Sequence, residues 1–155
     1  MPPARISAAS AKLIKPEWEN IGALVVGRHL YDMTNAWGGR HPIDVTTVVL
    51  THRRPDDRTE DDENFAFVTD GIEAAVATAK ELAGDKNVVV NGGQMARQAL
   101  EAGLLDEIGI ELVPVVLGAG KPLFPELSAT PVQFEGPIAV VEGTGVTHLR
   151  YRVKK

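Results

Sequence analysis

The stretch NVVVNGGQMARQAL, residues 87–100, places a glycine pair between a short apolar run and a run with helical spacing. Residues 87–90 predict a strand, because the run is continuous and rich in β-branched side chains. Residues 94–102 predict a helix. Two interpretations of Gly92 and Gly93 stay open at this point: a plain tight turn, or a backbone that a charged ligand approaches closely.

The same alternation of strand-like and helix-like segments extends along the chain in both directions. Apolar runs predict strands at residues 21–26, 45–50, 65–68 and 108–116, and helical periodicity predicts a helix over residues 72–83. Asp70 with Glu73 matches a capping box for that helix, and Gly84 matches a C-terminal cap. Pro114 places the last of these strands at a sheet edge or a bulge.

The end of the chain has a different pattern. Residues 138–142 and 146–153 flank Gly143-Thr144-Gly145, which predicts a hairpin. In the last run one face carries Thr147, Leu149, Tyr151 and Val153, and the other carries His148, Arg150 and Arg152. The whole pattern predicts an α/β fold with a mixed, mostly parallel sheet, helices on both faces and a C-terminal antiparallel hairpin. In such sheets ligands bind beyond the carboxyl ends of the strands.

Length and composition narrow the class of protein. The 155 residues fit a single domain, with residues 1–20 as a helical or irregular N-terminal segment. A net charge of −5 disfavours nucleic acid as a partner, and the lack of cysteine excludes disulfides and thiolate chemistry. No apolar run approaches the ~20 residues that span a bilayer, and no signal peptide is visible, so we expect a cytoplasmic protein. The four histidines lack metal-ligand spacing, so we expect no metal site.

Two further strand ends resemble the opening stretch in their chemistry. Gly27, Arg28 and His29 follow the first predicted strand, where a glycine frees the backbone and an arginine offers donors for a phosphate. An ordinary turn with a surface arginine remains the alternative. Thr51, His52 and Arg53 follow the second strand, where a hydroxyl and cations suit a terminal phosphate. Their alternative role is to neutralise the polar loop at residues 52–64.

Other candidates are less specific. Trp37, followed by two glycines, is consistent with stacking on a planar ligand or with anchoring a loop on the core. Ser7, Ser10 and Ser128 lack the surroundings of a nucleophile. The carboxylates Asp106, Glu107 and Glu111 are most simply solvated ends of strands. No residue is assigned to catalysis from the sequence.

Taken together, several segments resemble the C-terminal domain family of bacterial bifunctional deaminase–reductases, which has a dihydrofolate reductase-like fold. The resemblance covers roughly residues 20–153 and rests on ALVVGRHLYDM, TTVVLTHRRP, NVVVNGGQMARQALEAGLLDEIGIELVPVVLGAGKPLF and GVTHLRYRV, in this order. It implies an NADPH-dependent reductase that transfers hydride to a small heterocyclic substrate of pterin or aminopyrimidine type. Known members include dihydrofolate reductase-like enzymes and the 5-amino-6-(5-phosphoribosylamino)uracil reductase of riboflavin biosynthesis.

The resemblance also implies which residues hold the cofactor. Gly27, Arg28 and His29 match the turn at the phosphates, and Thr51, His52 and Arg53 match the strand end at the adenosine ribose and its 2′-phosphate. Asn91, Gly92, Gly93, Gln94 and Met95 match the turn under the pyrophosphate and nicotinamide. An arginine beside the 2′-phosphate favours NADPH over NADH, because a fixed cation compensates the extra charge. Asp32, Trp37 and His41 are the expected residues on the substrate side.

Two departures from the family pattern matter for function. Members begin with a strand that carries a Ser-Leu-Asp-Gly-like turn, whereas this sequence starts with PPARISAASAKLIKPEWEN. Asn91 stands where reductases of the riboflavin pathway carry an acidic residue, which argues against that substrate. A nucleotide-binding or structural homologue without turnover, and a fragment that folds only as an oligomer, are therefore the alternatives. A homodimer is expected, because family members dimerise and exposed sheet edges recruit pairing.

Overall fold

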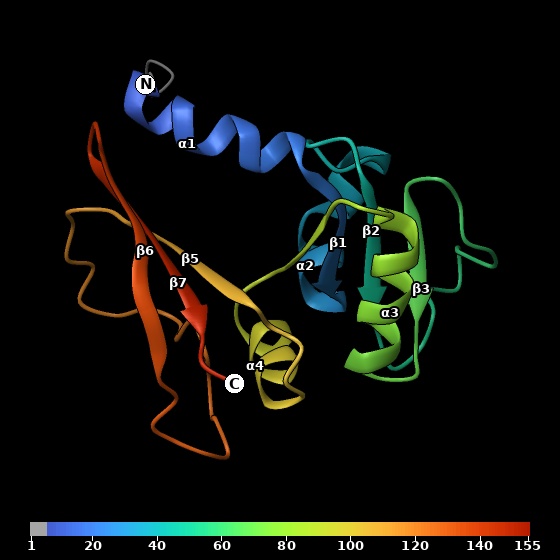
Figure 1. Cartoon of the computed structure of the whole chain (residues 1–155). Coiled ribbons are helices and arrows are strands. Elements are labelled where there is room, and N and C mark those ends of the chain that lie inside the picture. The colour runs from blue at the N-terminus through green and yellow to red at the C-terminus, as the bar shows by residue number, and fades with distance from the viewer. Residues whose placement is uncertain (1–5) are drawn as a thin grey trace. The chain divides into compact units, whose positions relative to one another are not determined.

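The computed structural model describes residues 6–155 and groups them into two compact units (Figure 1). The parallel unit comprises residues 20–104 and 121–128, and the antiparallel unit comprises residues 6–19, 105–120 and 129–155. The prediction of one domain over residues 1–155 stays a prediction. Within residues 6–155, no helix has both the length and the apolar character that a membrane crossing requires.

The parallel unit is built on a four-stranded sheet. Its strands are β1 (Ile21–Gly27), β2 (Thr46–Leu50), β3 (Phe65–Val68) and β4 (Asn87–Val90), all parallel, in the order β3-β2-β1-β4. Its helices are α2 (Arg28–Met33), α3 (Ile72–Ala83) and α4 (Gln94–Glu101), with the 3₁₀ segment η1 at Asn35–Gly39. The predicted strands and helices of this region are confirmed to within a residue at each end.

Both faces of this sheet are buried, which explains why its strands are continuously apolar. On one face Leu24, Val26, Val49, Phe65 and Phe67 pack with Tyr31 of α2. On the other face Ala23, Val25, Val48 and Ala66 pack with Ala75, Val76 and Ala79 of α3. Helices α2 and α3 accordingly lie on opposite faces (Figure 1), as predicted.

The predicted capping box at Asp70 and Glu73 is wrong. Helix α3 has Gly71 as its N-cap, at φ 93° and ψ 176°, and no side chain caps it. Asp70 thus lies one residue outside the position from which its carboxylate reaches the first-turn amides. The C-terminal cap at Gly84 is confirmed, at φ 60° and with its amide bonded to the Lys80 carbonyl.

The antiparallel unit contains a three-stranded sheet and one helix. Its elements are α1 (Ala8–Glu19), β5 (Glu107–Leu112), β6 (Phe134–Gly143) and β7 (Val146–Val153), with the strand order β5-β7-β6. The C-terminal hairpin is confirmed, although β6 begins four residues earlier than predicted. The prediction that the strand beginning at residue 108 extends to residue 116 is wrong: β5 ends at Leu112, before Pro114, which has no amide hydrogen for the ladder.

The α/β class with a parallel core and a C-terminal antiparallel hairpin is confirmed. The antiparallel strands, however, form a sheet of their own, because β7 pairs on both edges with strands of its own unit. The predicted alternation along β7 also holds. His148 and Arg150 contact Ser10 and Glu17 of α1, so Leu149 and Tyr151 lie on the opposite face.

Candidate functional site

The three glycine- and arginine-bearing segments meet at one edge of the parallel sheet. Gly27 of β1 is in register with Leu50 of β2, and Val25 is in register with Val90 of β4. The Asn91 amide donates to the Val25 carbonyl over 3.0 Å. The carboxyl ends of β2, β1 and β4 are therefore neighbours, which is the edge where ligands bind in parallel α/β sheets.

Arg28 links two of these strand ends. Its Nε donates to Asp32 Oδ1 over 2.8 Å, and its Nη1 donates to the Arg53 carbonyl over 3.0 Å. Thr51 is buried, and its hydroxyl donates to the same carbonyl over 2.8 Å. Both side chains thus hold the turn after β2 in shape. Thr51 is buried and therefore has a structural role at this edge. The Arg28 side chain, in contrast, keeps 36% of its surface exposed to solvent.

Arg53 presents the freest cation at this edge. Its side chain is 81% exposed and lies 3.5 Å from the equally exposed Asp56 carboxylate. Such a loose surface ion pair contributes little and is readily exchanged for a ligand phosphate. His29 and His52 are also exposed at this edge. Arg54, in contrast, is held by Asp61 at 2.7 Å and lies over the Phe67 ring.

The glycine turn after β4 is shaped by a second chain segment. Gly93 is the N-cap of α4 at φ 75° and ψ −136°, a conformation that favours glycine. Its amide donates to the Leu123 carbonyl over 2.9 Å, so this donor is already used. Leu123 Cδ1 also lies 3.2 Å from the position that a Cβ on Gly92 would take. The donors left at this helix end are the amides of its first turn, from Gln94 onward.

Met95 has a packing role at the same turn. It is buried, and its side chain lies 3.6–3.8 Å from the position that a Cβ on Gly27 would take. The contact joins the end of β1 to the first turn of α4. Met95 therefore positions the two segments relative to one another.

Residues 121–128 are held along α4 by three hydrogen bonds at four-residue spacing. Besides the Gly93–Leu123 bond, Arg97 Nη1 donates to the Glu126 carbonyl over 3.2 Å, and the Ser128 amide donates to Glu101 Oε1 over 2.7 Å. Positions 93, 97 and 101 share one helix face. The segment therefore lies along this face and begins at the glycine turn.

The Glu101 contact makes this attachment sensitive to acid. The Ser128 backbone amide, its hydroxyl and the Arg97 charge together hold the pKa of Glu101 below its ordinary value of 4.5. A depressed carboxyl pKa stabilises the contact above pH 4.5, and this stabilisation is lost as the pH falls through the folded-state pKa. In an NMR titration the Ser128 amide shift should follow that lowered midpoint, and Glu101→Gln should abolish the inflection. Glu73→Gln serves as the control, and a midpoint at or above 4.5 contradicts the assignment.

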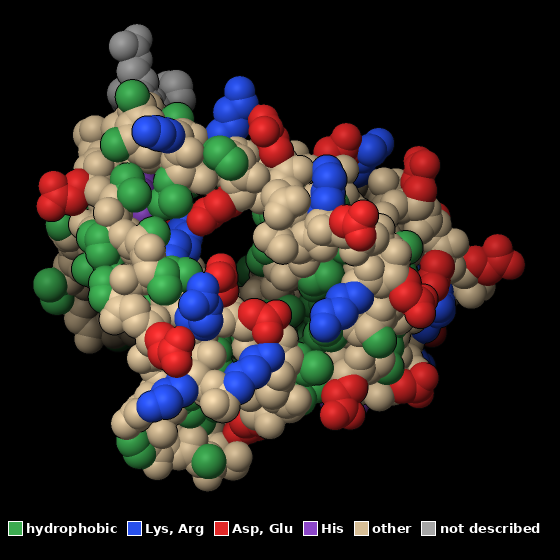
Figure 2. Space-filling model, in the orientation of Figure 1, with side chains coloured by type: hydrophobic (Ala, Val, Ile, Leu, Met, Phe, Trp, Pro, Cys, Tyr) green, Lys and Arg blue, Asp and Glu red, His purple; other side chains and the backbone are tan. Residues whose placement is uncertain are grey.

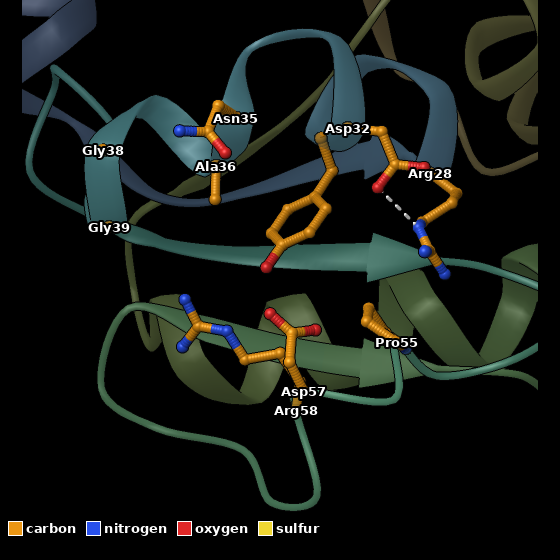
Figure 3. Close-up of a pocket in the computed structure, with 10 residues that line it drawn as sticks. Arg28, Asp32, Asn35, Ala36, Gly38, Gly39, Pro55, Asp57 and Arg58 are labelled. Atoms are coloured by element: carbon orange, nitrogen blue, oxygen red, sulfur yellow. Dashed lines mark hydrogen bonds and ion pairs between the residues drawn. The ribbon is translucent and has the colours of Figure 1, made fainter.

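A polar cleft of about 440 Å³ opens beside α2 in the parallel unit. Figure 3 shows Asn35 and Ala36 on one side of the cleft, with Asp57 and Arg58 of the loop before β3 facing them. Arg58 is fixed by Asp62 at 2.9 Å and by the Phe65 ring. The loop at residues 52–64 is therefore ordered around this cleft and is more than a solvated connection.

One of the three residues expected on the substrate side lines this cleft. Asp32 lines it, paired with Arg28. Trp37 and His41 do not line it: their rings lie 4.6 Å apart, and Trp37 packs against the core. These contacts favour the loop-anchor interpretation of Trp37. Burial lowers the pKa of His41 below 6.5, which favours its neutral form.

The antiparallel unit holds a polar cluster that the sequence interpretation missed. His148 Nε2 lies 2.8 Å from Ser10 Oγ, and His148 Nδ1 is bonded to Glu111. Arg150 pairs with Glu111 at 2.8 Å and with Glu17 of α1 at 2.8 Å. The sequence contained one indication of this cluster. Ser10 and Glu17 are two helical turns apart, so they share one face of α1. His148 and Arg150, which they contact, are alternate residues on one face of β7.

The order serine, histidine, carboxylate matches that of acyl-transfer triads, but the surroundings do not. Ser10 is 3% exposed, and a Cβ on Gly143 would collide with its Oγ. The hydroxyl therefore has no room for an acyl group, and the cluster secures α1 on the sheet. Within residues 6–155 no three His, Cys, Asp or Glu side chains are placed to hold a metal ion.

Comparisons with known proteins agree with this geometry. Residues 13–144 match the RibD C-terminal domain. The uncharacterized protein YwjB of Bacillus subtilis is 27% identical over 111 residues, which are 72% of this chain and 63% of YwjB, so the chain spans less than two thirds of that relative.

Two solved structures show the fold. A protein from Shewanella sp. PV-4, provisionally assigned to riboflavin biosynthesis, has a TM-score of 0.73 at 22% identity, covering 100% of this chain and 84% of that one. Dihydrofolate reductase from Enterococcus faecalis, complexed with NADP(H), has a TM-score of 0.60 at 20% identity, covering 93% and 80%. With this fold and a match over residues 13–144, the chain belongs to the RibD C-terminal domain family.

Proposed function

We propose that this protein is an NADPH-dependent reductase acting on a small heterocyclic substrate of pterin or aminopyrimidine type. The observation that carries the proposal is the meeting of three segments, residues 27–29, 51–53 and 91–95, at the carboxyl edge of β2, β1 and β4. The dihydrofolate reductase-like fold and the NADP(H) complex of one structural relative support the same class of cofactor.

The donors at this edge fit an anionic dinucleotide. Arg53 would meet the 2′-phosphate, because its guanidinium is exposed and only loosely paired. The half-exposed Arg28 and the first-turn amides of α4 would hold the pyrophosphate, since both present donors without a full set of partners. NADPH, when bound, supplies the hydride. The chain contributes binding, orientation and the exclusion of water.

The polar cleft beside α2 is the substrate-side candidate. It adjoins Arg28, which belongs to both the cleft and the cofactor edge. Its donors and acceptors, Asn35, Asp57 and Arg58 among them, suit the ring nitrogens and carbonyl groups of a heterocycle. Asn91, uncharged at the end of β4, disfavours the riboflavin-pathway pyrimidine as the substrate.

Binding of the two nicotinamide cofactors tests the proposal. Arg53→Ala should weaken NADPH about 10-fold or more while changing NADH less than 3-fold, because only NADPH carries the charge that Arg53 would compensate. Titrations followed by nicotinamide fluorescence measure both affinities. Arg40→Ala is the matched control, since Arg40 lies at the amino end of β2, beside Asp44.

Three outcomes separate the alternatives. Equal losses for NADPH and NADH would remove the 2′-phosphate role of Arg53. No NADPH binding at millimolar concentration would remove the reductase proposal. Tight binding without oxidation in the presence of any pterin or aminopyrimidine would identify a nucleotide-binding homologue without turnover.

A further inference from the structure

A second cleft, of about 300 Å³, opens in the parallel unit at the amino ends of its strands. Ile21 and Gly22, which begin β1, and Thr46, which begins β2, line it. In Figure 1 these are the ends opposite the arrowheads, whereas the proposed cofactor residues lie at the carboxyl ends. Small-molecule sites have volumes of roughly 300–1,000 Å³. The cleft is therefore large enough for a small ligand and is separate from the cofactor edge.

Two apolar side chains, Leu82 and Val45, line this cleft. Leu82 lies in α3 and is 48% exposed, although Val76, Ala79 and Ala83 of the same helix are buried. An exposed leucine in a concave site gains free energy when an apolar group of a ligand covers it. The cleft thus offers contact to an aliphatic group.

Charged side chains of both signs line the same cleft. Glu63 comes before β3, and Lys86 comes after α3. Arg40 and Asp44, which also line it, form an ion pair with one another. Acidic and basic side chains are similarly mixed on the face of the parallel unit that Figure 2 shows. The cleft therefore combines apolar contact with groups for both a cation and an anion.

The groups suited to a cation have no partner in the part of the chain that the structure describes. The Glu63 carboxylate forms no hydrogen bond or ion pair there, and only its backbone carbonyl accepts from Thr46, over 2.8 Å. The side-chain amide of Asn64, a partly buried residue, is likewise unbonded there. A carboxylate and an amide oxygen are acceptors for an ammonium group. The Lys86 ammonium has three donors, which suit a carboxylate.

This combination of groups discriminates between classes of ligand. A simple anion would meet the carboxylates of Asp44 and Glu63, and a neutral apolar molecule would desolvate charges without pairing them. A metal ion needs several ligating side chains, and no three His, Cys, Asp or Glu residues are grouped for this among residues 6–155. A molecule with an ammonium, a carboxylate and an apolar group satisfies every part of the cleft.

We propose that this cleft binds a small zwitterion of the α-amino acid type with an aliphatic side chain. The ammonium group bonds Glu63 and Asn64, the carboxylate pairs with Lys86, and the aliphatic side chain covers Leu82. None of these residues belongs to the proposed cofactor or substrate site. The amino acid site is therefore independent of the proposed reductase activity.

Four matched ligands test the proposal on the wild-type full chain. L-Leucine carries both charges, 4-methylpentanoate lacks the ammonium group, 3-methylbutylamine lacks the carboxylate, and glycine lacks the side chain. In an NMR titration, leucine should cause saturable shifts of the Thr46, Asn64 and Ala83 amides in the millimolar range. The other three ligands should each bind about 10-fold more weakly or worse, because each lacks one of the contacts.

Two substitutions assign the charges to residues. Glu63→Gln should weaken leucine and 3-methylbutylamine about 10-fold and leave 4-methylpentanoate unchanged, because only the ammonium contact is lost. Lys86→Gln should weaken leucine and 4-methylpentanoate and leave the amine unchanged. Glu60→Gln and Lys80→Gln are the matched controls, at exposed positions outside the cleft, and should bind leucine as the wild type does.

Several results would overturn the amino acid site. One is leucine binding that is no tighter than the binding of both single-charge analogues. Others are leucine binding that both glutamine variants leave intact, and shifts confined to the carboxyl ends of the strands. A titration without saturation up to about 100 mM leucine would overturn it as well. These measurements contain no NADPH, so their failure is distinct from a failure of the reductase proposal.

Discussion

Replacing Gly22 by alanine should lower the free energy of unfolding by about 3 kcal/mol. Gly22 lies in β1, where α3 crosses the sheet, and a Cβ there would meet the Ala83 backbone at 2.7 Å from Cα and 2.8 Å from the carbonyl oxygen. Backbone atoms cannot turn aside as a flexible side chain does. The strand or the helix must therefore shift, and both belong to the closely packed core of the parallel unit.

Gly27→Ala is the matched control for Gly22→Ala. Gly27 lies in the same strand, at φ −84°, and a Cβ there would make an ordinary contact with Met95 at 3.6 Å. The free energy of unfolding should change by less than about 1 kcal/mol, or rise slightly, because alanine restricts the unfolded chain. Urea denaturation measures both variants. Equal stabilities for Gly22→Ala and the wild type would contradict the close approach of α3.

Replacing His148 by alanine should also cost about 3 kcal/mol of unfolding free energy. His148 is 2% exposed and joins Ser10 of α1 to Glu111 of β5. Alanine leaves a cavity in place of the imidazole and removes a hydrogen-bond partner of the buried Ser10 hydroxyl. The loss should fall on the attachment of α1 to the sheet, because Glu111 keeps its ion pair with Arg150.

A double-mutant cycle separates the hydrogen bond from the cavity. Ser10→Ala and His148→Ala should couple by about 1 kcal/mol or more, since each removes the partner of the other. His29→Ala, at an exposed position, is the control and should be nearly neutral. The measurement is again urea denaturation. Additive effects of the two substitutions would show that no direct bond joins these side chains.

Most strands and helices of the parallel unit followed from local pattern. The continuous apolar runs of β1 and β2 reflect burial on both faces, and the glycines after β4 and α3 reflect conformations that other residues avoid. The prediction failed at Asp70 and Glu73, where the residue pattern of a capping box was present but the helix started from Gly71. Spacing alone does not report which residue adopts the cap conformation.

The candidate site was only partly predictable, because the spacing of residues in the sequence does not show which groups bond to one another in the fold. Strand ends that carry Arg28, Arg53 and Gly93 were recognisable, and parallel pairing brought them to one edge. The hydrogen-bond partners of these groups were not predictable. Arg28 donates to the Arg53 carbonyl, and the Leu123 carbonyl accepts from the Gly93 amide. The sequence marks groups that are able to bind phosphate. It does not mark which of those groups are already occupied by the fold.

The sequence by itself determined the α/β class, the strand-glycine-helix unit at residues 87–100 and the alternation along β7, because periodicity and glycine conformations act between near neighbours. Only the tertiary structure decided that Ser10 meets His148, 138 residues away, and that Leu123 meets Gly93, 30 residues away. It also decided which face of β5-β7-β6 received a helix. These contacts depend on packing between distant segments, on which the local residue pattern carries no information.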